Sequence, residues 1–498
     1  MSLTVTDLAA ALPGAKVHGA GGEDRPIGGL AYDSRQVRPG DLFVCIKGFV
    51  HDGHDYAPEA AARGAAALMV ERVLPLPLPQ IVVTDCRRAM GPAAARLFGD
   101  PSRRLRVIGV TGTNGKTTTT FLIRAMMEAA GGRCGLIGTI EQSVGTRRLS
   151  ATRTTPESAD IQRLLAEMVA NGCTAAAMEV SSHGLVLRRT EGTEFDVAVF
   201  TNITQDHFDF HRTFAEYREA KAMLFRSLVT SAGQQDGVKG NKCGVINADD
   251  PNAPYFVAAT PVRVITYGLT EGCDVRAKEV QVTADGVRYT LVSPMGERPV
   301  RLRLTGRFNV YNSLAAIAVG LNEGLDLDRV LAGIEETVVP GRFEPVSAGQ
   351  DFSVIVDYAH TPDSLANVLQ TARSLTRGRV ICVIGAGGDR DRSKRPLMGE
   401  VAAQLADYVV VTSDNPRSEE PEAICRDVAE GVRRHATPYD IVVDRREGIR
   451  RAVGLARAGD LVLIAGKGHE TYQEFRDRTV HFDDREEARK ALQERGYA

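Results

Sequence analysis

The segment Val107–Thr120 has the composition of a phosphate-binding turn. It reads VIGVTGTNGKTTTT, so an apolar strand leads into a glycine-rich turn and then into threonines that can begin a helix. Backbone N–H groups in such a turn, together with a helix N-terminus, form an anion site. Lys116 would neutralise the terminal phosphates of a nucleotide, and the Thr117 hydroxyl would ligate Mg²⁺.

The turn is a shorter variant of the general phosphate-loop pattern. That pattern places a glycine five residues before Gly115, where this chain has Val110, and here Gly112 lies three residues before Gly115 instead. The plain alternative is a glycine-rich turn that binds nothing. The lysine, the run of threonines and the strand-to-helix context favour a nucleotide.

Two further residues are candidate metal ligands in the same region. Glu179 ends the apolar segment AAAMEV, and His207 lies in TNITQDHFDFH. Mg²⁺ prefers oxygen ligands and keeps several waters. Alternatively, Glu179 caps a helix that starts at the following serines, and His207 is a structural histidine.

A second set of polar residues follows four near-continuous apolar segments toward the C-terminus. Such segments are typical of buried parallel strands, and ligands bind at the carboxyl ends of these strands. The loops DYAHTPDS, GAGGDRDR, SDNPR and GKGHE are therefore the expected place for chemistry. The four predicted strands are Phe352–Tyr358, Arg379–Gly385, Asp407–Ser413 and Asp460–Gly466.

The elements that would position these residues form an α/β protein of roughly three domains, since 498 residues exceed one hydrophobic core. We expect domains at residues 1–98, 99–337 and 338–498. Alternation of strands and helices predicts mostly parallel sheets. Residues 231–303 instead predict an antiparallel addition at the edge of the central sheet. The other predicted elements are strands Asp41–Ile46, Gln80–Asp85, Leu105–Val110, Ala175–Val180 and Val197–Thr201, and helices Pro58–Ala67, Thr117–Ala130 and Asn309–Gly320.

The composition excludes several classes of protein. The 61 Lys+Arg and 63 Asp+Glu leave a formal charge of −2, which argues against a strongly basic nucleic-acid binder. The sequence has neither a signal peptide nor a bilayer-spanning apolar stretch, so we expect a cytoplasmic protein that needs no membrane. The 8 cysteines form no CxxC pair and are expected to be reduced.

The motifs, in order and spacing, resemble the Mur ligases, which build peptidoglycan precursors. The resemblance covers nearly the whole chain. It rests on TGTNGKTT, MEVSSHGL, TNITQDHFDFH, YREAKAMLF, GRFNVYNSLAA, VPGRFE, DYAHTPDSL, GDRDRSKRPLM, SDNPRSEEP and AGKGHETYQ. It implies an N-terminal UDP-binding domain, a central P-loop ATPase and a C-terminal Rossmann-like domain that binds the amino acid.

The resemblance also implies a reaction. ATP would phosphorylate the D-glutamyl carboxylate of UDP-MurNAc-L-Ala-D-Glu, and the amine of an incoming amino acid would attack the acyl phosphate. The catalytic residues would be Lys116, Lys221, Arg342 and His207, with Mg²⁺ held by Thr117, Glu179, His207 and Lys221. The residues expected at ATP are Gly112, Thr113, Asn114, Gly115, Lys116, Thr117, Thr118, Asn309, Arg342 and Asp357.

Other roles follow from the resemblance alone. Lys221 matches a lysine that the family carbamylates to N6-carboxylysine; by itself it would be a solvated helix residue. Relatives with a glutamine two residues before Arg189 differ from this chain, which has Leu187. His360 would orient substrate or satisfy a backbone group. The residues expected at UDP-MurNAc-dipeptide are Ser34, Arg35, Thr154, Thr155, Ser181 and Arg189. The threonines in TRTTPES could also form a helix cap.

The segment Asp414–Arg417, DNPR, resembles the members of the family that add meso-diaminopimelate. This amino acid differs from lysine by a second carboxylate, which an arginine can bind through two hydrogen bonds. The residues expected at diaminopimelate are Arg390, Asp414, Asn415, Pro416, Arg417, Gly466 and Glu470. The alternative for DNPR is a solvated turn.

Three other functions remain open at this point. The same ligation could use L-lysine or another diamino acid, or the chain could be a ligase similar to folylpolyglutamate synthetase. A nucleotide-dependent switch would need the phosphate loop but not the C-terminal motifs. We expect a monomer.

Overall fold

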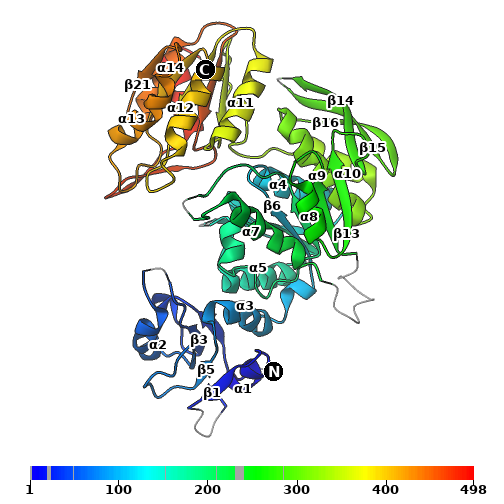
Figure 1. The fold of residues 1–498 in the computed structure, drawn as a ribbon, viewed down its shortest axis with the longest axis vertical. Helices are drawn as coiled ribbons and strands as arrows, with labels where there is room; N and C mark the ends of the chain where they lie inside the picture. Colours follow the sequence, from blue (N-terminus) through cyan, green and yellow to red (C-terminus); the bar gives the residue numbers. More distant parts are fainter. Residues whose placement is uncertain are drawn as a thin grey trace.

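The computed structural model describes residues 3–19, 24–48, 50–151, 153–208, 210–229, 241–283 and 285–497. Three successive parts of the chain each build a sheet covered by helices, so the predicted three-part α/β fold is confirmed. Figure 1 shows the N-terminal part at one end of the molecule, the C-terminal part at the other end and the central part between them.

The N-terminal sheet has the strand order β1-β5-β4-β3-β2, parallel except for the β1–β5 pair. Two apolar clusters, one on each side, cover it. The predicted helix Pro58–Ala67 is wrong at its end, because the helix stops at Ala62 and Ala67 begins a strand. The elements are α1 Val5–Ala10, β1 Lys16–His18, β2 Gly29–Ala31, η1 Ser34–Gln36, β3 Asp41–Val44, η2 Gly53–Tyr56, α2 Ala57–Ala62, β4 Ala67–Val70, β5 Gln80–Val82 and α3 Cys86–Leu97.

The central sheet has eleven strands in the order β16-β15-β14-β13-β12-β11-β6-β10-β7-β8-β9. The elements up to the last parallel pair of the sheet are η3 Pro101–Arg103, β6 Arg106–Thr111, α4 Lys116–Ala129, β7 Cys134–Ile137, β8 Glu141–Val144, β9 Arg147–Ser150, α5 Ser158–Ala170, β10 Ala175–Glu179, α6 Ser182–Val186, β11 Val197–Phe200, α7 Phe214–Arg226, β12 Cys243–Asn247, α8 Ala253–Ala259, β13 Arg263–Gly268 and β14 Val275–Thr283. They are followed by β15 Gly286–Ser293, β16 Gly296–Leu302, α9 Arg307–Asn322 and α10 Leu327–Glu335.

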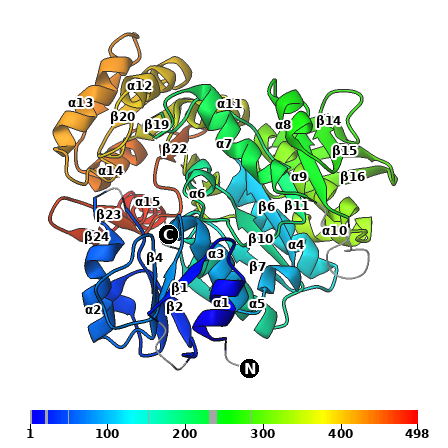
Figure 2. The ribbon, with the colours of Figure 1, turned by 60° about the horizontal axis from the view of Figure 1, so that its bottom comes forward.

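The antiparallel addition to this sheet is real but shorter than predicted. β12 and β13 continue the parallel sheet, and only β14, β15 and β16 pair antiparallel. Residues 230–240 lie outside the described part of the chain. A second antiparallel extension, β8–β9, was not predicted. Residues of α4, α9 and α10 fill one apolar cluster of the sheet, and residues of α5, α7 and α8 fill the other. Figure 2 shows these helices around the central strands.

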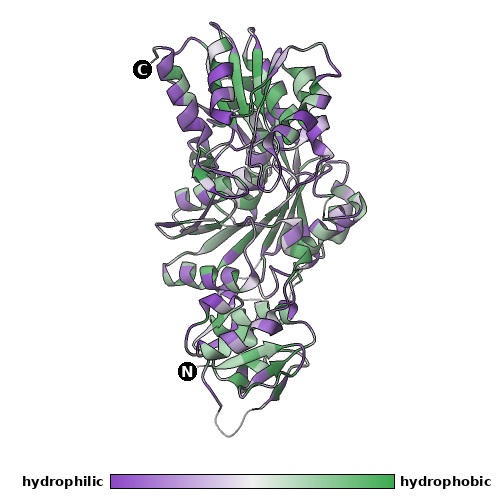
Figure 3. Ribbon diagram, turned by 90° about the vertical axis from the view of Figure 1, so that its left-hand side faces the viewer, coloured by the Kyte–Doolittle hydropathy of each residue, from purple (hydrophilic) through white to green (hydrophobic). Residues whose placement is uncertain are grey.

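The C-terminal sheet has the order β17-β18-β22-β19-β20-β21, with β17 antiparallel and the remaining pairs parallel. Its parallel strands are strongly apolar and lie between helices, as the hydropathy colours of Figure 3 show. The elements are β17 Glu344–Pro345, β18 Ser353–Asp357, α11 Pro362–Leu375, β19 Val380–Ile384, α12 Lys394–Leu405, β20 Tyr408–Val411, α13 Pro421–Val432, β21 Tyr439–Ile441, α14 Arg445–Leu455, β22 Leu461–Ala465, β23 Tyr472–Glu474, β24 Thr479–His481 and α15 Asp484–Glu494.

Two further sequence expectations concern the whole chain. All eight cysteines are free, and seven of them are buried. Within the described residues, none of the helices combines the length and the apolar character that crossing a bilayer requires.

Candidate active site

The phosphate loop joins β6 to α4 and is held by the adjacent strand end. Gly115 caps α4 with φ 86°, and a Cβ there would lie 2.4 Å from Asn312 Oδ1. At Gly112, with φ 152°, a Cβ would lie 1.9 Å from Thr201 Oγ1. Both positions therefore require glycine. The backbone N–H groups of Thr113 and Asn114 donate to Asn202, to its carbonyl oxygen over 2.8 Å and its Oδ1 over 3.0 Å.

Two lysines converge on this loop. Lys116 Nζ donates to the carbonyl oxygens of Gly112 and Thr113 over 2.9 and 2.8 Å. Lys221 Nζ, on α7, donates to the same Gly112 oxygen over 2.7 Å and lies 4.5 Å from the Tyr217 ring centroid. Lys221 is buried, not solvated. Burial, and secondly Lys116, lower the pKa of Lys221 well below its ordinary value, which favours the neutral amine.

Arg342 connects the C-terminal part to the start of α4. Its NH2 group donates to Thr117 Oγ1 over 3.1 Å, and its guanidinium lies 4.6 Å from the ring centroid of Tyr358. The buried Nε of Arg342 has no acceptor among the described residues. A buried donor without a partner costs free energy, and an anionic ligand would supply the missing acceptor. Thr118, the next residue of α4, is also buried.

Asn309 and Asp357 are both buried. Asn309 Nδ2 donates to the Thr305 carbonyl over 2.8 Å, and its Oδ1 accepts from Asn312. Asp357 accepts from the backbone N–H groups of Phe343 and Ala359 over 2.7 and 2.8 Å. Burial raises the pKa of Asp357 to about 6, although Arg342 opposes this.

The candidate metal ligands lie at neighbouring strand ends. Glu179 pairs in register with Val110, just before the phosphate loop, and its two carboxylate oxygens accept from Thr139 N and Oγ1. It does not cap a helix, because Ser181 is the N-cap of α6. His207 has φ 57°, and its ring lies 4.8 Å from that of His183.

The oxygen ligands offered by Thr117 and Glu179 fit an Mg²⁺ ion that is bound together with a nucleotide. The described residues contain no group of three or more His, Cys, Asp or Glu arranged around one metal position. Mg²⁺ in such sites takes one or two protein oxygens and completes its shell with water and phosphates. A carboxylate at Glu179 and a hydroxyl at Thr117 provide that number.

Three of the residues expected near the muramoyl-dipeptide place their side-chain hydroxyl groups close together beside Glu179. Thr155 Oγ1 lies 3.0 Å from both the Glu179 carbonyl and Ser181 Oγ, and Thr154 Oγ1 lies 3.0 Å from Thr139 Oγ1. Neither threonine caps α5, which starts without a side-chain cap, so the helix-cap alternative is wrong.

Of the remaining residues expected at this substrate, Arg189 lies beside Thr155, and the other two lie in the N-terminal part. Arg189 donates to the Thr155 carbonyl over 3.2 Å and forms a 3.0 Å ion pair with Glu157. In the N-terminal part, Ser34 is buried and donates to Glu59, whereas Arg35 pairs with Asp33 and its side chain is 80% exposed.

The loops after β20 and β22 meet in the C-terminal part. Asn415 Nδ2 donates to Glu470 Oε2 over 2.8 Å. Gly466 has φ 121°, and a Cβ there would lie 2.6 Å from Asp414 Oδ2. Pro416 closes against Gly388, where a Cβ would lie 1.8 Å from the Pro416 carbonyl oxygen.

The two arginines expected at diaminopimelate differ. Arg417 has φ 51°; its Nε donates to Glu474 Oε2 over 3.0 Å and its NH1 donates to the Gly388 carbonyl over 2.7 Å. It is therefore not a solvated turn residue. Arg390 is exposed, and its NH1 donates to the Asp389 carbonyl. His360 Nδ1 lies 2.9 Å from the Tyr358 carbonyl, so it satisfies a backbone group.

Sequence reasoning missed the side chains that join the two halves of the site. Asn114 Nδ2 donates to Asp363 Oδ2 over 2.8 Å, and Lys394 forms an ion pair with Asp206. Asp363 and Lys394 lie in the motifs DYAHTPDSL and GDRDRSKRPLM, so these motifs are the sequence signal that could have identified them. With the Arg342–Thr117 contact, they place the C-terminal part against the phosphate loop.

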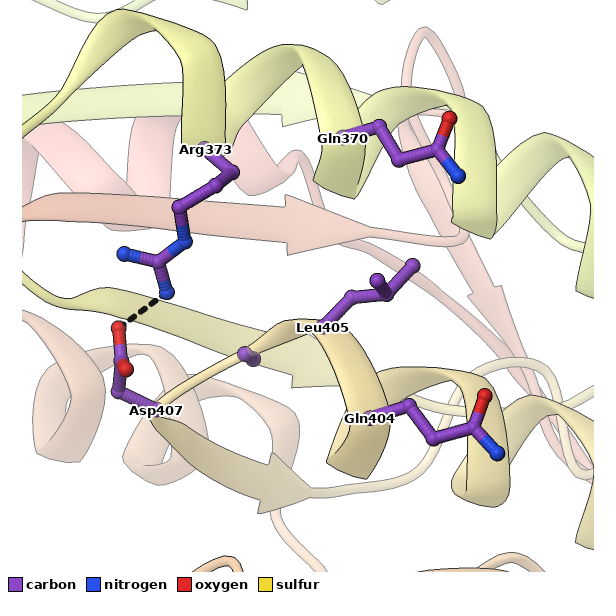
Figure 4. Close-up of a pocket in the computed structure, with 6 residues that line it drawn as sticks. Gln370, Arg373, Gln404, Leu405 and Asp407 are labelled. Carbon is purple, nitrogen blue, oxygen red and sulfur yellow. Dashed lines mark hydrogen bonds and ion pairs between the residues drawn. The ribbon is translucent and has the colours of Figure 1, made fainter.

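A surface hollow of about 420 Å³ between α11 and α12 lies elsewhere (Figure 4). Arg373 and Asp407 form an ion pair there, and Asp407 also accepts from the N–H of Val380, the first residue of β19. The hollow is thus at the amino ends of the strands, opposite the carboxyl ends that carry the site. None of the expected site residues lines it.

Comparison with known proteins agrees with this geometry. Three family models match in succession: the Mur ligase family catalytic domain over residues 26–96, the Mur ligase middle domain over 110–320, and the Mur ligase glutamate ligase domain over 341–468. A Geobacillus kaustophilus protein named UDP-N-acetylmuramoyl-L-alanyl-D-glutamate--2,6-diaminopimelate ligase is 50% identical over 97% of this chain and 98% of its own length. The chain belongs to the Mur ligase family.

Other Mur ligases extend the comparison. A Bacillus cereus protein of the same name is 45% identical over 94% of this chain and 95% of its own. A solved structure of a ligase with that name has 33% identity and a TM-score of 0.69 over the full length of both chains. MurF from Thermotoga maritima, solved in complex with ADP, shares the fold at 19% identity, with a TM-score of 0.66 over 94% of this chain and 98% of that one.

Proposed function

We propose that this protein is an ATP-dependent amide ligase that joins meso-diaminopimelate to the D-glutamyl carboxylate of UDP-MurNAc-L-Ala-D-Glu. The observation that carries the proposal is the contact between a phosphate loop and a domain that presents the DNPR and GKGHE loops. The names of relatives up to 50% identical over nearly the whole chain support the same substrates.

The residues divide the work as follows. Lys116 and the N–H groups at the start of α4 would bind the terminal phosphates, and Arg342 would neutralise charge from the opposite side. Phosphoryl transfer depends mainly on such positioning and charge neutralisation. The γ-phosphoryl group passes to a glutamyl carboxylate oxygen, and ADP leaves. The amine of diaminopimelate then attacks the acyl carbon, and inorganic phosphate leaves as the amide forms.

Thr117 and Glu179 would hold the Mg²⁺ at the phosphates, and His207 and a carbamylated Lys221 would help to hold a second Mg²⁺ near the reacting carboxylate. Mg²⁺, when bound, offsets the charge of the phosphates and of the reacting carboxylate. The lowered pKa of Lys221 supports carbamylation, because a neutral amine can take up CO₂. Thr154, Thr155, Ser181 and Arg189 would hold the muramoyl-dipeptide, with Ser34 and Arg35 at the uridine end.

Amino-acid choice would depend on Arg417, with Arg390 as a second cation. Glu470, Asn415, Asp414, Pro416 and Gly466 would surround the charged end of diaminopimelate. We also propose that residues 1–98, 99–337 and 338–498 act as the UDP-substrate, ATP and amino-acid domains. The protein would work in the cytoplasm as a monomer, without nucleic acid or membrane.

The decisive experiment is ligation with competing substrates. The protein, ATP, Mg²⁺ and UDP-MurNAc-L-Ala-D-Glu are incubated with meso-diaminopimelate, L-lysine, or neither, and the product is identified by mass spectrometry. We expect the diaminopimelate adduct and little lysine adduct, because lysine lacks the second carboxylate that Arg417 and Arg390 would bind. Equal turnover with lysine would overturn the amino-acid assignment, and a product formed only from folate and glutamate would overturn the substrate class.

A further inference from the structure

Lys467, in the loop after β22, is a buried lysine to which the proposed reaction gives no role. Its side chain is 0% exposed. Nζ donates to Glu470 Oε2 and to Asn415 Oδ1, each over 3.0 Å, and lies 5.4 Å from the ring centroid of Tyr472. An ammonium group is costly to bury unless its partners are well placed.

The surroundings of Lys467 are acidic. Asp414 and Glu470 come from two different loops, and Glu470 forms an ion pair with Lys467 over 3.0 Å. Burial, and secondly Asp414, raise the pKa of Glu470, whereas Lys467 opposes that change. Lys467 and Arg445 lower the pKa of Asp414 against the effect of its burial. Without Lys467, the repulsion between the carboxylates of Asp414 and Glu470 would be offset less.

The contacts of Lys467 also fix the direction of Glu470. Both Lys467 and Asn415 donate to the same oxygen, Oε2. No described residue donates a hydrogen bond to Oε1 of Glu470, and 14% of this side chain is exposed. One carboxylate oxygen is therefore anchored while the other stays available to a cation that enters from solvent.

We propose that Lys467 is a positioning residue for the incoming amino acid, because it anchors Glu470 and Asn415 so that the free Glu470 oxygen can accept an ammonium group of the substrate. This inference rests on the proposed ligase function. A purely structural role is the alternative. The fully buried Arg445–Asp484 pair already ties these loops to α14 and α15, since Arg445 also donates to the Ser413 and Ala465 carbonyls.

The test is Lys467→Met, with Lys490→Met as a matched control. Lys490 also pairs with a glutamate three residues away, Glu487, but it is 56% exposed and lies on α15. We expect Lys467→Met to raise the KM for diaminopimelate by roughly tenfold or more, with little change in the KM values for ATP and the UDP-substrate. Lys490→Met should leave all three unchanged.

A double variant separates positioning from an independent effect. If Lys467 acts through Glu470, then adding Lys467→Met to Glu470→Gln should raise the KM for diaminopimelate little further. If the increases in the KM for diaminopimelate of the two single variants multiply in the double variant, the inference is wrong. It is also wrong if Lys467→Met changes the KM values for all three substrates equally. Should Lys467→Met not fold, Lys467→Gln keeps an uncharged N–H donor group and is expected to give an intermediate KM; a wild-type KM in this variant would contradict the role.

The outcomes also separate this inference from the proposed function. If the wild type ligates only lysine, the amino-acid assignment fails, and the same variants are then compared with lysine. If no ligation occurs, the ligase proposal fails, and calorimetric titration of diaminopimelate into wild type and Lys467→Met still measures the expected roughly tenfold difference in Kd. Equal Kd values would overturn the role of Lys467.

Discussion

The guanidinium group of Arg342 donates a hydrogen bond to the hydroxyl of Thr117, 225 residues earlier in the chain. The donor precedes the first strand of the C-terminal sheet, and the acceptor is the second residue of α4. The contact brings a positive charge to the side of the phosphate loop that faces the C-terminal part. It also stacks Arg342 on Tyr358 and leaves its Nε available.

Arg342→Ala should lower kcat by about 10³-fold, because a cation that stabilises phosphoryl transfer in related chemistry contributes on this scale. The affinity for ATP should change much less. Assays that follow ADP release over time measure kcat, and calorimetry measures the Kd for ATP. The control is Arg373→Ala, which removes the ion pair at the far end of the C-terminal sheet. Similar kcat values for the two variants would refute the role of Arg342.

Lys116→Ala should abolish detectable ligation, with a loss of at least about 10²–10³-fold in kcat. The reason is that its side chain lies against the loop backbone, where Nζ donates to two carbonyl oxygens. The partly exposed Lys278, on β14 and away from the loop, provides a control substitution, Lys278→Ala. Circular dichroism verifies that both variants are folded. Residual activity above a tenth of wild type would contradict this assignment.

Arg417→Ala should raise the KM for diaminopimelate by roughly 30-fold or more, and the KM for ATP by less than about threefold. Arg417→Lys should recover only part of the loss, since lysine cannot bind a carboxylate through a fork of two N–H groups. Arg476→Ala is the matched control, because Arg476 is exposed and its partners among the described residues are the nearby Ser418 carbonyl and Glu420. Unchanged diaminopimelate kinetics in Arg417→Ala would mean that another residue binds the second carboxylate of this substrate.

Asp484→Ala should destabilise the protein by about 3–5 kcal/mol, because it leaves the fully buried Arg445 without its carboxylate partner. Urea unfolding of the C-terminal part measures the change in free energy of unfolding. The double variant Arg445→Met with Asp484→Leu should recover most of the loss, since it removes both charges. A loss below about 1 kcal/mol in Asp484→Ala would show that the pair is not stabilising in this way.

Asp357 should make the protein less stable as the pH rises from about 4 to 7. Its pKa is about 6 in the folded protein against an ordinary value of 3.8. The folded state therefore binds the proton more tightly; this contribution is complete below pH 3.8 and is lost as the pH rises through 6. The difference corresponds to about 3 kcal/mol.

The measurement compares wild type with Asp357→Asn, which cannot ionise. The variant loses an acceptor and should be less stable at low pH, but the gap in free energy of unfolding between the two proteins should narrow as the pH rises from 4 to 7. A constant gap over this range would show that Asp357 does not titrate near pH 6.

Sequence reasoning predicted the buried parallel strands well. β18, β19, β20 and β22 lie within the four predicted apolar segments, because a strand covered on both faces needs a continuous apolar run. It failed where strand direction decides the outcome. β12 and β13 pair parallel, but nothing in their residues distinguishes a parallel strand from an antiparallel one.

Local propensity explains another error. The alanine-rich segment that contains α2 continues into ALMV, and alanine favours helix, yet these residues pair with β3 and β5 in the N-terminal sheet. For the site, motif spacing placed the loops at the correct strand ends. It could not show that Asn114 pairs with Asp363, or that Lys467 is buried between two loops, because these contacts depend on tertiary packing.

The three contacts between the phosphate loop region and the C-terminal part also bear on biosynthesis. Arg342, Asp363 and Lys394 emerge from the ribosome 225, 249 and 188 residues after their partners Thr117, Asn114 and Asp206. Because domains tend to fold as they are synthesised, the nascent central part can fold before these partners exist. A chain released early would thus carry a phosphate loop without its opposing arginine, and the last third of translation would complete the catalytic centre.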